Sequence, residues 1–201
     1  NNNTKKDVME TPLWINGNPQ ATNMHKYMQY VREKYREAAD CNNYDDLHRW
    51  SVTYLNDFWT SIVDYCDIKM TPKTAVPLGN PLVSIDTIPK WFQGATLNFA
   101  EHLLHLRGPQ PALHFISERD DTVRTITRDQ LRRLVGKTAN ALRSVGVKAG
   151  DRVAAFCANV PEVVVFALAA ACIGASYAAA SADFGADAVV DRFEQIKPKV
   201  I

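Results

Sequence analysis

The sequence predicts an α/β protein, with a helical region in residues 1–108 and the beginning of an open, mostly parallel sheet in residues 109–201. The first region is rich in aromatic residues at helical spacing and is interrupted by long loops. In the second region short apolar strands alternate with helices. Such alternation requires parallel strands joined by helical crossovers, so we expect helices on both faces of the sheet.

The helical region is predicted to contain several separate segments. Thr22 is a candidate N-cap for a helix that runs to about Ala39. A short helical turn is expected over residues 45–50, and a further helix from about Tyr54 to Cys66. Residues 67–90 hold four prolines and are expected to be extended and irregular. A last helix, from about residue 99 to 106, is expected to be closed by Gly108.

The α/β region begins with a predicted hairpin. Residues 111–117 are expected to form a strand with Ala112, Leu113 and Phe115 facing inward, and residues 123–126 its partner. Thr127 and Gln130 have the spacing of a capping box, which predicts a helix to about Val145. Its predicted buried stripe comprises Leu131, Leu134, Val135, Thr138, Ala139 and Leu142.

Three strands and two helices are expected in the remainder. Strands are predicted over residues 152–157 and 175–180, joined by a helix from Pro161 that Gly174 ends. Asp187 is the predicted cap of the next helix, which Pro198 ends before a strand at Val200. Ligands in such folds bind beyond the carboxyl ends of the strands, so residues 158–161 and 181–185 form the candidate site.

Composition excludes several classes of partner. The formal net charge of +1 provides no field that favours nucleic acid or an anionic membrane. Residues 163–182 carry no charge over about the length of a membrane span, but the predicted break at Gly174 divides them into a helix and a strand. Four dispersed cysteines indicate a reducing compartment, which we take to be the cytoplasm, and Cys157 and Cys172 are expected in the core.

No catalytic motif emerges from the residues themselves. The glycines at 146 and 150 follow a helix and precede a strand, which is the wrong order for cradling a phosphate. His102 and His105 can share a helix face, but no third metal ligand follows nearby. The nucleophile motif Gly-x-Ser-x-Gly is absent.

The ends of the chain suggest a piece of a longer protein. The sequence starts without Met and stops at Ile201, where an apolar strand begins. Because natural domains seldom end on an unpaired apolar strand, we expect both ends to be cuts.

Three segments together resemble the adenylate-forming acyl-CoA synthetases. Residues 91–98 read WFQGATLN, similar to the segment that joins the N-terminal extension of the short-chain enzymes to their main body. Residues 126–162 resemble the first core motif of the superfamily. Residues 181–185 read SADFG, close to the SPDFG of the acetoacetate branch with Ala182 in place of proline. The resemblance covers about residues 12–201.

The resemblance implies a fold and a reaction. It implies that residues 109–201 are part of the N-terminal subdomain of the adenylate-forming fold, preceded by the extension typical of short-chain enzymes. The complete enzyme would use ATP and Mg²⁺ to convert acetoacetate to an acyl-adenylate, which CoA then attacks. No phosphate-binding run of the family occurs between residues 1 and 201, so no catalytic residue or metal ligand is assigned and this chain alone is expected to be inactive.

One loop is carried over from the family. In the related acetate enzymes, the loop that matches Ser181, Asp183 and Phe184 lies beside the CoA nucleotide, so these residues are the candidate CoA-side site. Like charges repel, so Asp183 would be a poor neighbour for a phosphate. A structural role for this loop is an equal alternative.

Three other functions stay open. The chain could belong to an acetate or propionate enzyme, since the acyl pocket is not recognisable. It could be a non-catalytic binding module, or a nucleotide-binding oxidoreductase domain, although the glycine fingerprint of the latter is missing. The expected partners are acetoacetate, ATP, CoA and the remainder of its own polypeptide.

Overall fold

The computed structural model describes residues 14–73, 76–79, 84–87 and 90–201. Parts of the predicted irregular segment, including Pro81 and Pro89, lie outside these residues. The chain divides into two compact units, one formed by residues 1–68 and 76–93 and the other by residues 69–75 and 94–201. Among the described residues, no helix is both long and apolar enough to cross a membrane.

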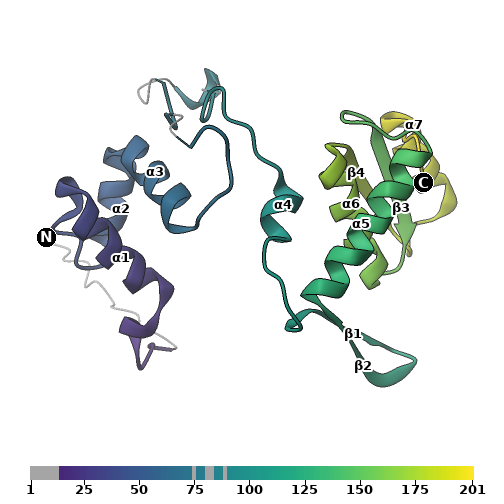
Figure 1. Ribbon diagram of the computed structural model, residues 1–201, viewed down its shortest axis with the longest axis horizontal. Coiled ribbons are helices and arrows are strands. Elements are labelled where there is room, and N and C mark those ends of the chain that lie inside the picture. Colours follow the sequence, from purple (N-terminus) through teal and green to yellow (C-terminus); the bar gives the residue numbers. More distant parts are fainter. Residues whose placement is uncertain (1–13, 74–75, 80–83, 88–89) are drawn as a thin grey trace, which may run out of the picture. The chain divides into compact units, whose positions relative to one another are not determined.

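The first unit is built from three α-helices and short 3-10 turns (Figure 1). The predicted helices all occur, but the first is shorter than expected. It ends at Lys34 because Tyr35 adopts an extended conformation, and the Tyr35 ring packs at a tilt against Trp50 with ring centroids 5.5 Å apart. In order, the elements are η1 (Pro19–Ala21), α1 (Asn23–Lys34), η2 (Arg36–Ala38), α2 (Tyr44–Thr53), α3 (Leu55–Tyr65) and η3 (Ile85–Thr87).

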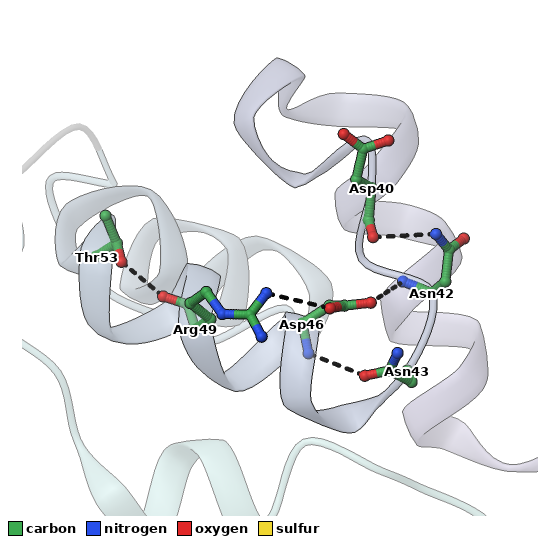
Figure 2. Close-up of polar contacts among 6 residues, drawn as sticks. All are labelled: Asp40, Asn42, Asn43, Asp46, Arg49 and Thr53. Carbon is green, nitrogen blue, oxygen red and sulfur yellow. Dashed lines mark hydrogen bonds and ion pairs between the residues drawn. The ribbon is translucent and has the colours of Figure 1, made fainter.

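Side-chain caps define where these helices begin. The Thr22 hydroxyl accepts from the His25 amide at 3.2 Å and caps α1, as predicted. Figure 2 shows the start of α2, where the Asn43 side chain accepts from the Asp46 amide at 3.0 Å. The Asp46 carboxylate in turn accepts from the Asn42 amide and pairs with Arg49. Such caps satisfy amides that the first turn leaves unpaired.

The second unit holds all the strands of the described residues. Its elements are α4 (Phe99–Leu103), β1 (Pro111–Ser117), β2 (Asp120–Thr127), α5 (Arg128–Ser144), β3 (Arg152–Cys157), α6 (Pro161–Ile173), β4 (Ser176–Ser181) and α7 (Ala186–Ile196). β1 and β2 form the predicted antiparallel hairpin, which leads directly into α5 (Figure 1). β3 and β4 pair in parallel, and Val200 bridges in parallel to Val153 on β3.

Helices cover both faces of the parallel pair, as the sequence predicted. On one face Val153 packs with Val135 of α5 and Ala169 of α6. On the other face Ala154 and Ala180 pack with Val189 and Phe193 of α7. Successive strand residues point to opposite faces, which explains why Val153 and Ala154 belong to different clusters.

Two backbone hydrogen bonds hold the segment that follows α7 beside β3. The Lys199 amide donates to the Arg152 carbonyl at 2.7 Å, and the Ala154 amide donates to the Val200 carbonyl at 2.9 Å. The Lys199 ammonium also pairs with Asp151 at 3.0 Å. A bond to the Lys148 amide, followed by the contact with Lys199, lowers the pKa of the Asp151 carboxyl.

The α/β region corrects four sequence expectations. Ala112 is exposed, because it alternates with the half-buried Leu113 along β1. Leu134 of α5 is 40% exposed. Gly185, not Asp187, is the N-cap of α7, and Asp187 lies within its first turn. The helix after Asn98 ends at Leu103, five residues before Gly108.

Candidate functional site

The two predicted loops follow neighbouring strands at one edge of the sheet. β3 ends at Cys157 and β4 ends at Ser181, and these two residues are direct partners in the parallel register. Because both strands point the same way, the loops 158–160 and 182–185 leave the sheet at the same edge. The carboxyl edge of β3 and β4 is therefore the position at which an open α/β sheet binds ligands.

Ser181 and Asp183 interact within the second loop. Both are exposed, and interaction with the Ser181 hydroxyl lowers the pKa of the Asp183 carboxyl below its ordinary value. Asp183 therefore carries a negative charge at neutral pH, which disfavours a phosphate at this position.

Phe184 presents an aromatic ring at the same edge. Its amide donates to the Ser181 carbonyl at 3.1 Å, which closes the turn. The ring is 37% exposed and lies 4.6 Å from the guanidinium carbon of Arg192 on α7. The loop thus offers a partly open aromatic ring, over which the Arg192 cation of α7 lies.

The loop after β3 has a different character. It reads Ala158-Asn159-Val160, and α6 begins at Pro161 without a side-chain cap. The carboxyl group of Glu162, in the first turn, pairs with Arg124 of β2 at 2.8 Å, which lowers the Glu162 pKa. No glycine lets the backbone approach a pyrophosphate there. This loop therefore does not fit the phosphates of ATP.

The structure separates the two cysteines that were expected in the core. Cys157, at the end of β3, is exposed, which contradicts the expectation, whereas Cys172 on α6 is half-buried and packs against the core cluster that contains Val153. Cys157 lies at a strand end, where the sheet stops and side chains face solvent. Burial raises the pKa of the Cys172 thiol, so that thiol is unreactive at neutral pH.

The histidine pair does not form a metal site. The rings of His102 and His105 stack with centroids 5.4 Å apart, in accord with their predicted proximity. In the part of the chain that the structure describes, no three His, Cys, Asp or Glu side chains gather in a way that could hold a metal ion.

A large groove beside β3 was missed by the sequence analysis. It has a volume of about 990 Å³ and is bordered by β2, α5, β3 and α6. Leu134, Phe156 and Ile201 contribute exposed apolar surface to it, and Arg133 and Lys137 lie along α5. The helical stripe suggested that Leu134 was buried, since periodicity identifies an apolar face but not what covers it.

The contact between Arg192 and Phe184 is the other feature that the sequence analysis did not predict. Arg192 follows Phe184 by eight residues, across a loop and two helical turns. Such a contact depends on how α7 packs on the sheet, so spacing alone could not reveal it.

Comparisons with known proteins place this geometry in a family. A family described as "AMP-binding enzyme" matches residues 104–201, and one described as "Acetyl-coenzyme A synthetase N-terminus" matches residues 44–103. An acetoacetyl-CoA synthetase from Xenopus tropicalis is 36% identical over 198 residues, and one from Rhizobium meliloti is 38% identical over 195. These alignments cover 98% and 95% of this chain, respectively, and 29% of each relative.

A solved structure agrees with the sequence comparisons. The acetoacetyl-CoA synthetase from Streptomyces lividans superposes with a TM-score of 0.81 at 35% identity, over 89% of this chain and 27% of that one. The chain therefore spans less than a third of the length of the relatives it matches. With two adjacent family matches that together span residues 44–201, the chain belongs to the AMP-binding acyl-CoA synthetases.

Proposed function

We propose that this chain is part of an ATP-dependent acid–thiol ligase that activates acetoacetate as an acyl-adenylate and transfers it to CoA. The observation that carries the proposal is the 35–38% identity to acetoacetyl-CoA synthetases along nearly the whole chain. The parallel pair with its loop 182–185 at the carboxyl edge supports it further. The proposed location is the cytoplasm.

Within this proposal, the residues that the structure describes contribute to CoA binding only. The loop after β3 lacks the glycines that a phosphate site needs, so we assign the ATP and magnesium sites to other parts of the complete protein. Loop 182–185 is the proposed CoA side, with Ser181, Asp183 and Phe184 as its residues. The negative charge of Asp183 disfavours a phosphate close to it. We therefore place the uncharged part of the CoA nucleotide on the side of the loop where Phe184 lies.

We propose the same domain division that the sequence analysis predicts. We place the extension in residues 1–108 and the start of the AMP-binding domain at Pro109. The matched families meet between residues 103 and 104, and the second compact unit includes α4.

The acid is the part of the proposal with a specific rival. The family matched by residues 44–103 is named for acetyl-coenzyme A synthetase, and a malonamoyl-CoA synthetase from Penicillium aethiopicum is 35% identical over 197 residues. The test of this choice is therefore a direct comparison of different acids as substrates. The full coding sequence that contains these residues should be assayed with acetoacetate, acetate, propionate and malonamate, each with ATP, Mg²⁺ and CoA.

The expected result is AMP and thioester formation, with the highest kcat/KM for acetoacetate. A higher kcat/KM for another acid would overturn the choice of substrate but not the ligase. Absence of turnover with every acid would overturn the ligase and favour a binding module. The 201-residue chain alone is expected to form no AMP with any acid.

A further inference from the structure

The contact between Arg192 and Phe184 joins the candidate loop to a helix. The guanidinium carbon lies 4.6 Å from the centroid of the Phe184 ring. Phe184 ends the loop one residue before the N-cap Gly185, whereas Arg192 lies in the second turn of α7. A cation over an aromatic face at this distance attracts the ring electrostatically.

α7 is fixed to the sheet by its other face. Val189 and Phe193 are both 8% exposed and pack on Ala154 of β3 and Ala180 of β4. Arg192 is adjacent to Phe193 in sequence but points to the exposed side of the helix. The backbone of α7 at Arg192 therefore has a defined position relative to the sheet.

The hydrogen bonds within the loop are local. The Phe184 amide donates to the Ser181 carbonyl at 3.1 Å, and the Ser181 hydroxyl interacts with the Asp183 carboxyl. Both contacts lie within residues 181–184. The stack on Arg192 adds a contact that fixes the Phe184 ring relative to α7.

We propose that Arg192 is a positioning residue that holds loop 182–185 in its binding conformation through Phe184. This inference rests on the proposed CoA-side role of that loop. Arg192 acts on the ring, and the ring and loop backbone form the surface that the coenzyme meets.

The test uses the full coding sequence with Arg192→Gln, Arg192→Lys, Phe184→Leu and the double change Arg192→Gln/Phe184→Leu. Arg143→Gln, on the exposed last turn of α5, is the matched control for loss of an arginine charge. Hydrogen exchange of the Phe184 amide reports loop order. The KM for CoA, with kcat and the KM for ATP, reports function.

Arg192→Gln is expected to speed exchange at Phe184 and to raise the KM for CoA, each by about two- to five-fold, with kcat unchanged. Arg192→Lys should give an exchange rate and a KM for CoA between those of the parent and of Arg192→Gln, because an ammonium stacks less well on a ring than a planar guanidinium. In the Phe184→Leu background, Arg192→Gln should have no further effect. Arg143→Gln should resemble the parent.

The outcomes separate the two proposals. Unchanged exchange in Arg192→Gln overturns the positioning role, whatever happens to KM. Faster exchange with an unchanged KM for CoA upholds positioning and overturns the CoA side of the proposed function. If Arg192→Gln raises the KM for CoA in the Phe184→Leu background as well, Arg192 contacts CoA directly and the positioning role is overturned.

Discussion

At the scale of the single residue, Tyr27 illustrates how burial changes a side chain's acidity. It is 7% exposed, and its hydroxyl lies 2.5 Å from that of Ser61, which is fully buried. Burial raises the pKa of Tyr27 to about 12, and the hydrogen bond with Ser61 opposes part of this change. The neutral phenol is thus favoured in the folded chain.

A pH dependence follows for the helical unit. Because the folded pKa of Tyr27 exceeds the value of about 10 for an unfolded tyrosine, its contribution to the free energy of unfolding is complete below pH 10. That contribution is lost as the pH rises from 10 through 12. Urea unfolding followed by circular dichroism should show a shallower decline in stability over this range for Tyr27→Phe than for the parent.

The same substitution has an effect at neutral pH. Tyr27→Phe removes a buried hydrogen bond and is expected to cost about 1 kcal/mol. Ser61 retains its bond to the Phe58 carbonyl at 2.6 Å, which limits the loss. Tyr44→Phe is the control, since Tyr44 is 63% exposed. Equal stability of the parent and Tyr27→Phe would contradict the assigned role.

Asp183 provides a second residue-scale prediction, based on its ionised carboxylate. If loop 182–185 lies beside CoA, Asp183→Asn removes a negative charge near an anionic ligand and should lower the KM for CoA in the full-length protein. Since water weakens the interaction between exposed charges, a decrease of no more than about five-fold is expected. Asp121→Asn, in the β1–β2 hairpin, is the charge control. An unchanged KM in both Asp183→Asn and Ser181→Ala would argue for a structural loop.

At the scale of the element, the capping box of α5 accounts for where that helix begins. The Thr127 hydroxyl accepts from the Gln130 amide at 3.2 Å, and the Gln130 side chain accepts from the Thr127 amide at 2.8 Å. Both bonds were expected from the sequence. They satisfy two amides at the junction of the hairpin and the helix.

Loss of this cap should be measurable. Thr127→Ala is expected to lower the free energy of unfolding by about 1 kcal/mol, because the first turn loses its side-chain acceptor. Ser144→Ala, at the other end of the same helix, is the comparison. The Ser144 hydroxyl only bonds back to the Ala141 carbonyl, so its removal should change stability little. Equal losses in the free energy of unfolding of the two variants would indicate that the Thr127 cap does not stabilise α5.

Elements with strong local signals were predictable from sequence. Proline at the start of α6 and glycine after its end set that helix's bounds, and Gly174 has the expected left-handed conformation with φ of +81°. The inaccurate predictions depended on tertiary packing. α1 ends early at Tyr35, whose ring packs against Trp50, and Leu134 lies at an open groove although its spacing is that of a core residue.

The candidate site was predictable in place but not in detail. Parallel strands imply that residues 158–161 and 181–185 leave one edge, and the register of Cys157 with Ser181 agrees. The Arg192 contact and the ionised state of Asp183 depend on side-chain geometry. Local spacing carries no information about either.

At the scale of the whole molecule, the groove beside β3 affects behaviour in solution. Leu134, Phe156 and Ile201 are 40%, 44% and 72% exposed, and they adjoin the segment at Val200 that pairs with β3. Exposed apolar surface next to a strand edge promotes association. We expect the 201-residue chain to self-associate at micromolar concentration and to melt over a broad range.

Sedimentation velocity tests this expectation. Leu134→Lys combined with Ile201→Lys should increase the monomer fraction, since two charges would be buried in any contact through the groove. Val52→Lys, at a residue of α2 that is 55% exposed, should leave association unchanged. A parent chain that is monomeric and melts sharply would refute the prediction.

The short helix α4 has a consequence for where this protein can be divided. Ala100 and Leu104 belong to the same hydrophobic cluster as Val135 and Val153, and the Asn98 side chain donates to the Ala171 carbonyl at 2.9 Å. A recombinant AMP-binding region that starts at Pro109 would lack these three residues and expose their binding surface on α6. Starting upstream of Asn98 keeps these contacts, so residues 98–104 are needed to cover the core that α5, α6 and β3 form.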